Sequence, residues 1–161
     1  MSIAPFQFAP MPHLHFGWGV RHNLITHLQA EYAGRIVLIT GRFLSRPGAF
    51  GHTLCTALMQ THRHVDLFSL SGEPSPEQVD EIVAQCKTDT QVVVAIGGGS
   101  VLDAGKAIAG LIPSQTSVMN YLEGVGLGKP FKVKTCPFIA VPTTAGTGSE
   151  TTKNAVLSRI G

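Results

Sequence analysis

The residues most able to do chemistry form a glycine-rich run at positions 97–106. It lies within VVVAIGGGSVLDAGKAIAG, which extends from Val92 to Gly110. Three consecutive glycines, Gly97, Gly98 and Gly99, allow a sharp turn and let a phosphate approach the backbone with no Cβ in the way. A helix pattern begins directly after them, and the N–H groups and dipole of a helix start favour an anion. The run predicts a strand, a phosphate-binding loop and a helix.

Three polar side chains in this run each have two interpretations. Ser100 can cap the helix or donate to a phosphate oxygen, and Asp103 can complete a capping box or lie beside a ligand. Lys106 lies one turn further and either approaches a phosphate or is solvated, of which we expect the second. The run is not the fingerprint GxGxxG, because Leu102 stands at its third glycine. It is not an NTPase P-loop either, because Ala107 stands where that motif has Ser or Thr.

A second polar loop, 141–152, follows the apolar run Phe138–Val141 and has the sequence VPTTAGTGSETT. Its hydroxyl-bearing residues are Thr143, Thr144, Thr147, Ser149, Thr151 and Thr152. Because the loop begins where a buried strand should end, we expect it at the same sheet edge as the glycine run, where open α/β sheets bind ligands. Hydroxyls and glycine N–H groups can hold a pyrophosphate and an amide without a charged side chain. The alternative interpretation is an ordinary polar surface loop.

Segments typical of strands alternate along the chain with segments typical of helices. This alternation predicts a mostly parallel sheet with helices on its faces. We expect strands at His13–Phe16, Arg35–Thr40, His64–Leu70, Gln91–Ile96, Phe138–Val141 and Ala155–Ser158. We expect helices at Val20–Tyr32, at Ala49–Thr61, from Ser75 onward and at Ser100–Leu111. The third of these should begin with a capping box made by Ser75 and Gln78, with Pro76 in its first turn.

Length and charge limit the class of protein. The chain has 161 residues, which suggests one domain, and 43% of them are hydrophobic. Its net charge of +2 gives no electrostatic case for binding nucleic acid or a membrane surface. No apolar stretch approaches the roughly 20 residues that cross a bilayer, and the N-terminus lacks the layout of a signal peptide. We therefore expect a cytoplasmic protein.

The cysteines and histidines give little reason to expect a disulfide or a metal centre. The cysteines are Cys55, Cys86 and Cys136. They lie far apart and are interpreted as reduced, buried thiols. The pairs His13/His15 and His62/His64 have a spacing that can hold a metal on a strand, but neither has a carboxylate or cysteine at ligand spacing. We interpret them as ordinary surface or boundary histidines.

Taken together, the two loops resemble those of the iron-containing (group III) alcohol dehydrogenases. The resemblance is carried by GGGSVLDAGKAIA (97–109) and PTTAGTGSE (142–150), with support from HFGWG, RIVLIT and the Pro74-Ser75-Pro76 helix start. Dehydroquinate synthases and glycerol dehydrogenases share the fold and the glycine loop, but PTTAGTGSE fits the alcohol dehydrogenase branch better. The resemblance implies that residues 1–161 form an NAD(P)-binding, Rossmann-like α/β domain. That domain is the N-terminal one of the dehydroquinate synthase-like and iron alcohol dehydrogenase fold.

The resemblance also implies cofactor contacts at particular positions of this chain. The pyrophosphate is expected to be contacted by Gly98, Gly99 and Ser100, and Gly97 is expected among the cofactor-binding residues. The phosphates and the nicotinamide side are expected to be contacted by Thr143, Thr144 and Thr147. The surroundings of the nicotinamide are expected to include Asp103, Asn154 and Val156. The adenosine end is expected to meet Ser75 and Gly41.

Gly41 is a departure from the family pattern. Members that prefer NAD often carry Asp directly after the first nucleotide-binding strand, where it can bind the hydroxyls of the adenine ribose. Here Gly41 takes that position, and Arg42 and Arg46 follow. A 2′-phosphate would then meet no carboxylate and could pair with a guanidinium group. The hypothesis is that the cofactor is NADP at least as readily as NAD.

The resemblance places the metal site outside this chain. The family's metal, iron or zinc, is held by an aspartate and histidines of a helical C-terminal domain, expected beyond Gly161. We therefore expect the cofactor half of an enzyme that transfers hydride between NAD(P) and a small alcohol or aldehyde, and we expect this half to be inactive by itself. The alternative is a non-catalytic nucleotide-binding module. A homodimer through the strand near His13–Gly17 is also implied, because apolar edge segments are prone to pairing.

Overall fold

A single parallel sheet forms the centre of the computed structural model, which describes residues 11–44, 46–61 and 64–159. The strands are β1 (Arg35–Gly41), β2 (Val65–Leu70), β3 (Thr90–Gly97) and β4 (Phe138–Pro142), in the order β2-β1-β3-β4. Every neighbouring pair is parallel. The predicted fold class, a Rossmann-like parallel sheet with flanking helices, is confirmed.

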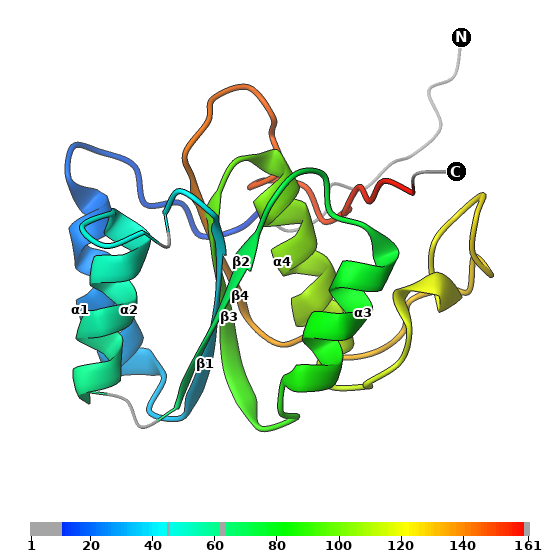
Figure 1. The fold of residues 1–161 in the computed structure, drawn as a ribbon, viewed down its shortest axis with the longest axis horizontal. Coiled ribbons are helices and arrows are strands. Elements are labelled where there is room, and N and C mark those ends of the chain that lie inside the picture. The colour runs from blue at the N-terminus through cyan, green and yellow to red at the C-terminus, as the bar shows by residue number, and fades with distance from the viewer. Residues whose placement is uncertain (1–10, 45, 62–63, 160–161) are drawn as a thin grey trace, which may run out of the picture.

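Helices cover both faces of the sheet (Figure 1). The α-helices are α1 (Asn23–Glu31), α2 (Phe50–Thr61), α3 (Pro76–Gln85) and α4 (Gly99–Leu111), and the short 3-10 helices are η1 (Val20–His22) and η2 (Val118–Asn120). Helices α1 and α2 lie on one face and α3 and α4 on the other, each pair with its own cluster of buried residues. None of the helices in the described ranges is both long and apolar enough to cross a membrane.

The central strands, β1 and β3, are covered on both sides. Successive side chains of a strand point to opposite faces. Ile36 and Leu38 therefore pack with α1 and α2, whereas Val37 and Ile39 pack with α3 and α4. All four side chains are fully buried. Because both of its faces are covered, β1 has a continuous apolar sequence and not an alternating one.

The parallel arrangement brings the carboxyl ends of the strands to one edge of the sheet. β3 ends at Gly97, which is paired with Pro142 at the end of β4. Thr143, the next residue, donates its N–H to the carbonyl oxygen of Gly97 at 2.9 Å. The loops after β3 and β4 therefore start side by side, and Figure 1 shows the second of them in orange near the start of α4.

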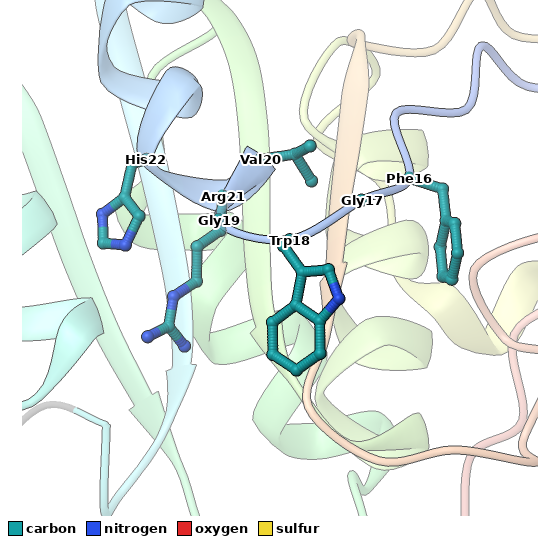
Figure 2. A pocket seen from close by; sticks show the side chains of 7 residues that line it. All are labelled: Phe16, Gly17, Trp18, Gly19, Val20, Arg21 and His22. Carbon is teal, nitrogen blue, oxygen red and sulfur yellow. The ribbon is translucent and has the colours of Figure 1, made fainter.

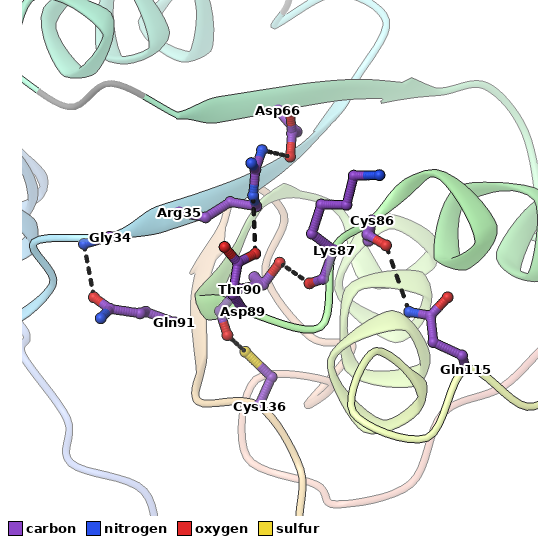
Figure 3. Close-up of polar contacts among 10 residues, drawn as sticks. All are labelled: Gly34, Arg35, Asp66, Cys86, Lys87, Asp89, Thr90, Gln91, Gln115 and Cys136. Atoms are coloured by element: carbon purple, nitrogen blue, oxygen red, sulfur yellow. Dashed lines mark hydrogen bonds and ion pairs between the residues drawn. The ribbon is translucent and has the colours of Figure 1, made fainter.

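Polar contacts close the opposite, amino edge of the sheet (Figure 3). Arg35 at the start of β1 bonds Asp66 at 3.0 Å and Asp89 at 3.2 Å. The Sγ of Cys136 donates to the carbonyl oxygen of Thr90 at 3.4 Å. The free, buried cysteines are Cys55, Cys86 and Cys136, which confirms the prediction of reduced thiols. This edge carries structural polar contacts, and the two polar loops lie at the other end of the strands.

Two of the predicted strands, His13–Phe16 and Ala155–Ser158, are wrong, because neither segment forms a strand. A strand persists where a neighbouring strand completes its hydrogen-bond ladder, and neither segment pairs with an edge of the described sheet. The first segment is exposed along its whole length. The second is anchored by a backbone bond from Ser158 N to Pro74 O at 2.9 Å.

Candidate functional site

The start of α4 presents backbone N–H groups at the carboxyl edge. The helix begins at Gly99 with Gly98 as its N-cap residue, and no side chain in the described part of the chain caps it. The N–H groups of Val101 and Leu102 bond to the carbonyl oxygen of Gly98 at 3.0 and 3.1 Å. The first N–H groups, those of Gly99 and Ser100, remain at the helix end, where the helix dipole favours an anion.

Glycine is required in this loop because of how closely its neighbours approach. A Cβ at Gly97 would lie 2.6 Å from Cβ of Val101, which is far inside van der Waals contact. A Cβ at Gly99 would lie 3.1 Å from Cγ2 of Thr147 and 3.2 Å from Oγ of Ser149. The glycine loop therefore touches both the first turns of α4 and the hydroxyl-rich loop.

The hydroxyl-rich loop, defined as residues 143–152, runs beside the glycine loop from Thr143 onward. The Oγ1 of Thr144 would lie 3.3 Å from a Cβ at Gly98. Thr144 is exposed, whereas Ser149 is buried. Glu150 carries a buried carboxylate oxygen, Oε2, for which the described residues offer no hydrogen-bond partner. The two loops thus form one cradle of glycine backbone and hydroxyl groups.

Two interpretations of the α4 side chains are wrong. Ser100 does not cap the helix and makes no capping box with Asp103; its hydroxyl donates to Oε1 of Glu73 at 3.5 Å. Lys106 is not solvated, because its side chain is only 10% exposed and its Nζ lies 2.8 Å from Oδ1 of Asp103. The physical reason is that the chain returns across α4 at Thr152, whose carbonyl and hydroxyl oxygens accept hydrogen bonds from Lys106.

The remaining predicted site residues lie around this cradle. The carbonyl oxygen of Asn154 accepts a hydrogen bond from Lys106, and the side chain of Val156 is exposed. Ser75 is the N-cap of α3, and its Oγ accepts from Gln78 N at 3.3 Å, which confirms the predicted capping box. Gly41 ends β1, one strand away from β3.

Glu73 is a residue of this edge that the sequence analysis missed. Its carboxylate accepts hydrogen bonds from the hydroxyls of Ser100, at 3.5 Å, and Ser158, at 3.2 Å. It therefore joins the loop after β2 to the start of α4 and to the chain after the hydroxyl-rich loop. Its place directly before Pro74, in a loop that follows a predicted strand, was the signal that could have found it.

Two arginine side chains lie over one aromatic ring just after β1. The guanidinium carbons of Arg42 and Arg46 lie 4.8 and 4.6 Å from the centroid of the Phe43 ring. Cation–π contacts of this kind hold guanidinium groups in place at a surface. Positive charge is thus concentrated beside Gly41, at the carboxyl end of β1.

The described histidines do not form a metal centre. His13, His15 and His64 are exposed, and His62 lies outside the described residues. In the ranges that the structure covers, no group of three or more His, Cys, Asp or Glu could hold a metal ion. These residues do not fit the iron or zinc that the resemblance implies.

Phe16–His22, a stretch that includes η1, lines an open, mostly apolar hollow (Figure 2). Phe16 and Trp18 are almost fully exposed, and Figure 2 shows them on the same side of the segment as Arg21. The guanidinium carbon of Arg21 lies 5.0 Å from the ring centroid of Phe50 in α2. This hollow consists of neighbouring residues along one stretch of chain and includes neither polar loop.

This chain is similar in sequence to proteins of known family. The model of the iron-containing alcohol dehydrogenase family matches residues 11–160. Long-chain-alcohol dehydrogenase 1 of Geobacillus thermodenitrificans is 34% identical over 160 residues, which are 98% of this chain and 40% of that protein. The NAD-dependent methanol dehydrogenase of Bacillus methanolicus is 33% identical over 145 residues, which are 88% of this chain and 36% of that protein.

A solved structure extends the agreement from sequence to fold. The sulfoacetaldehyde reductase of Bifidobacterium kashiwanohense, crystallised in complex with NAD+, matches with a TM-score of 0.78 and 30% sequence identity. The match covers 92% of this chain and 39% of that one, so this chain spans about two fifths of the length of such relatives. Since the family model spans almost all of the described residues, and sequence and fold agree, this chain belongs to the iron-containing alcohol dehydrogenase family.

Proposed function

We propose that this chain binds the dinucleotide NAD(P) as the cofactor half of an alcohol dehydrogenase or aldehyde reductase. The observation that carries the proposal is the contact between the glycine loop and the hydroxyl-rich loop, across Gly99 and Thr147, at a helix start that no described side chain caps. Relatives of known activity add support, since one is named an NAD-dependent methanol dehydrogenase and another was crystallised with NAD+. The whole length of 1–161 is proposed as the cofactor-binding domain.

The pyrophosphate is proposed to lie at the start of α4. Gly97, Gly98 and Gly99 let α4 and the hydroxyl-rich loop pack closely around it, and the N–H groups of Gly99 and Ser100 would donate to its oxygens. The hydroxyls of Thr143, Thr144 and Thr147 would complete the cradle from the other side. Such binding needs no lysine in contact with phosphate, because helix N–H groups and the helix dipole stabilise the anion.

The two ends of the cofactor are proposed to lie on either side of this cradle. The nicotinamide half would lie near Asp103, Asn154 and Val156, and the adenosine half near Ser75 and Gly41. The bound nicotinamide supplies the chemistry, since it accepts or donates a hydride as an alcohol and an aldehyde are interconverted. The described residues bind and orient the cofactor for this exchange.

NADP is proposed as a cofactor at least as good as NAD. A Cβ at Gly41 would meet Cγ2 of Val101 at 3.7 Å, an ordinary contact, so packing does not forbid a side chain there. A carboxylate at this position would repel a 2′-phosphate, and glycine removes it. The guanidinium groups over Phe43 supply positive charge nearby.

The metal and the partner subunit are proposed to complete the enzyme. Iron or zinc would be held in the part of the relatives' length that this chain does not cover. A homodimer is proposed through the segment near His13–Gly17, in the apolar run LHFGWG, whose exposed Phe16 and Trp18 would be covered by a second copy. A cytoplasmic location is proposed as well, since free cysteines suit a reducing compartment.

Calorimetric titration of the chain with NADPH and with NADH tests the cofactor proposal. Saturable binding is expected, tighter for NADPH. Thr147→Val removes one hydroxyl of the cradle with little change of shape and should weaken both ligands about tenfold, as expected for a lost hydrogen bond to a charged group. Thr88→Val, at an exposed position of the opposite sheet edge, is the matched control. Absence of binding by the unmodified chain at millimolar cofactor would refute the proposal.

A further inference from the structure

Lys106 projects from α4 about two turns after its start and is almost entirely covered. Its Nζ lies 2.8 Å from Oδ1 of Asp103 on the same helix, and the two side chains are 10% and 12% exposed. It also donates to the carbonyl oxygen of Thr152 at 3.3 Å, to Oγ1 of Thr152 at 3.0 Å and to the carbonyl oxygen of Asn154. The positive charge is therefore matched by one carboxylate and three further oxygens.

The segment that Lys106 contacts makes few other hydrogen bonds. Residues 152–158 form neither a helix nor a strand. Thr152 N bonds to Gly148 O at 3.3 Å, within the hydroxyl-rich loop, and the next backbone bond is from Ser158 N to Pro74 O at 2.9 Å. Between these two points, Lys106 supplies the hydrogen bonds that the described residues make to the segment.

The surroundings of Lys106 also argue against a contact with phosphate. An ammonium group has three protons to donate, and four oxygen atoms already surround this one. Breaking these contacts would leave the Asp103 carboxylate without its cation in a mostly buried place, which is costly. The Lys106 side chain therefore links α4 to residues 152–154 and has no free proton for a phosphate.

We infer that Lys106 is a positioning residue, which fastens the segment 152–156 to α4 and thereby holds Asn154 and Val156 in place beside the cofactor. This inference rests on the proposed function for the identity of the ligand, whereas the fastening itself rests on the contacts. A lysine that binds phosphate would strengthen the binding of every ligand that carries a pyrophosphate. A lysine that positions this segment would strengthen the binding only of ligands that reach the nicotinamide end of the site.

Three variants of the 161-residue chain separate these roles. Lys106→Met removes the charge and all four contacts. Lys153→Met is the matched control, since it removes the same charge from an exposed neighbour in the same segment. Thr152→Val removes a single acceptor at an exposed position and so keeps the test open should Lys106→Met fail to fold.

Amide hydrogen exchange without ligand measures the fastening directly. Exchange at Thr152 and Ser158 is expected to speed up at least tenfold in Lys106→Met. In Thr152→Val, exchange at Ser158 is expected to speed up about threefold. Exchange in Lys153→Met should stay within twofold of the unmodified chain, and amides of β3 serve as the internal reference. Unchanged exchange at Thr152 and Ser158 in Lys106→Met, together with unchanged exchange at Ser158 in Thr152→Val, would overturn the inference.

Titration with two ligands then measures the consequence for the site. ADP-ribose carries the pyrophosphate without the nicotinamide, and its dissociation constant should change less than twofold in Lys106→Met. That of NADH should rise at least fivefold. Equal losses for both ligands would assign Lys106 to the phosphate and overturn the inference. If the unmodified chain bound neither ligand, the proposed function would fail, and the exchange measurements would still decide whether Lys106 fastens the segment.

Discussion

Replacing Gly105 with alanine tests how closely α4 must pack on the sheet to hold its first turn at the carboxyl edge. A Cβ at Gly105 would lie 2.6 Å from Cβ of Ala95 on β3 and 2.9 Å from Cε2 of Phe138 on β4. Ala95 is fully buried in a central strand, so it cannot move aside. We expect Gly105→Ala to push α4 away from both strands.

Gly110 in the same helix is the matched control. A Cβ there would lie 3.3 Å from Cζ of Phe131, a side chain that is 43% exposed and can turn away. Alanine is favoured over glycine inside a helix by about 1 kcal/mol, whereas overpacking a core costs about 1–3 kcal/mol. Gly110→Ala should therefore gain somewhat less than 1 kcal/mol of unfolding free energy. Gly105→Ala should lose up to about 2 kcal/mol after the helix preference is subtracted from the overpacking cost.

Urea unfolding followed by circular dichroism measures both variants under the same conditions. A difference of about 2 kcal/mol between them corresponds to roughly 4–8 °C in thermal midpoint for a domain of this size. Gly105→Ala should also weaken NADPH binding, because the N–H groups of Gly99 and Ser100 would move with the helix. Equal gains of stability in the two variants would refute the argument that Gly105 sets the distance between helix and sheet.

Three further predictions follow from the site and its supports. Ser75→Ala removes the cap that Gln78 N uses and should cost about 1 kcal/mol of unfolding free energy in urea titrations; no loss would mean that solvent replaces the cap. Gly41→Asp should lower the ratio of NADPH to NADH affinity by roughly tenfold, about 1.4 kcal/mol, in paired titrations, and an unchanged ratio would contradict the role given to this position. Burial raises the pKa of Cys86 to about 12 and that of Cys136 to about 11, from 9.0. Because the unfolded chain loses these protons first, these thiols should leave the free energy of unfolding unchanged below pH 9. Above pH 9 they should lower it, up to about pH 11 for Cys136 and about pH 12 for Cys86. The slope is up to about 1.4 kcal/mol per pH unit for each thiol, and alanine at both positions should remove this part of it.

The elements with strong local signals were predictable from sequence. β1 and β3 are continuous apolar runs because both of their faces are buried. The start of α3 could be predicted from the capping box of Ser75 and Gln78 and from Pro76 in the first turn. The glycine run was correctly placed between β3 and α4, because glycine and a following helix pattern are local features. Where local chemistry decides the structure, sequence reasoning succeeded.

The predictions that were wrong or missing concern features that depend on contacts with distant parts of the chain. The segments His13–Phe16 and Ala155–Ser158 have strand-like composition, but composition does not reveal whether a neighbouring strand is present. The environment of Lys106 is decided by Thr152 and Asn154, which lie 46 and 48 residues away. The approach of Glu73 to Ser100 likewise spans 27 residues. Such long-range contacts leave no periodic signal in the sequence.

The strand order also has a consequence for how the chain behaves at high concentration. β2 and β4 are the two edges of the described sheet, and an open edge offers unpaired backbone groups to another chain. β2 carries the charge of Asp66, whereas β4 has the uncharged sequence FIAVP with every residue only partly covered or exposed. Pro142 blunts the end of β4, because it has no N–H to donate. Aggregation, where it occurs, should therefore begin by strand pairing at β4, next to the loop that we assign to the cofactor.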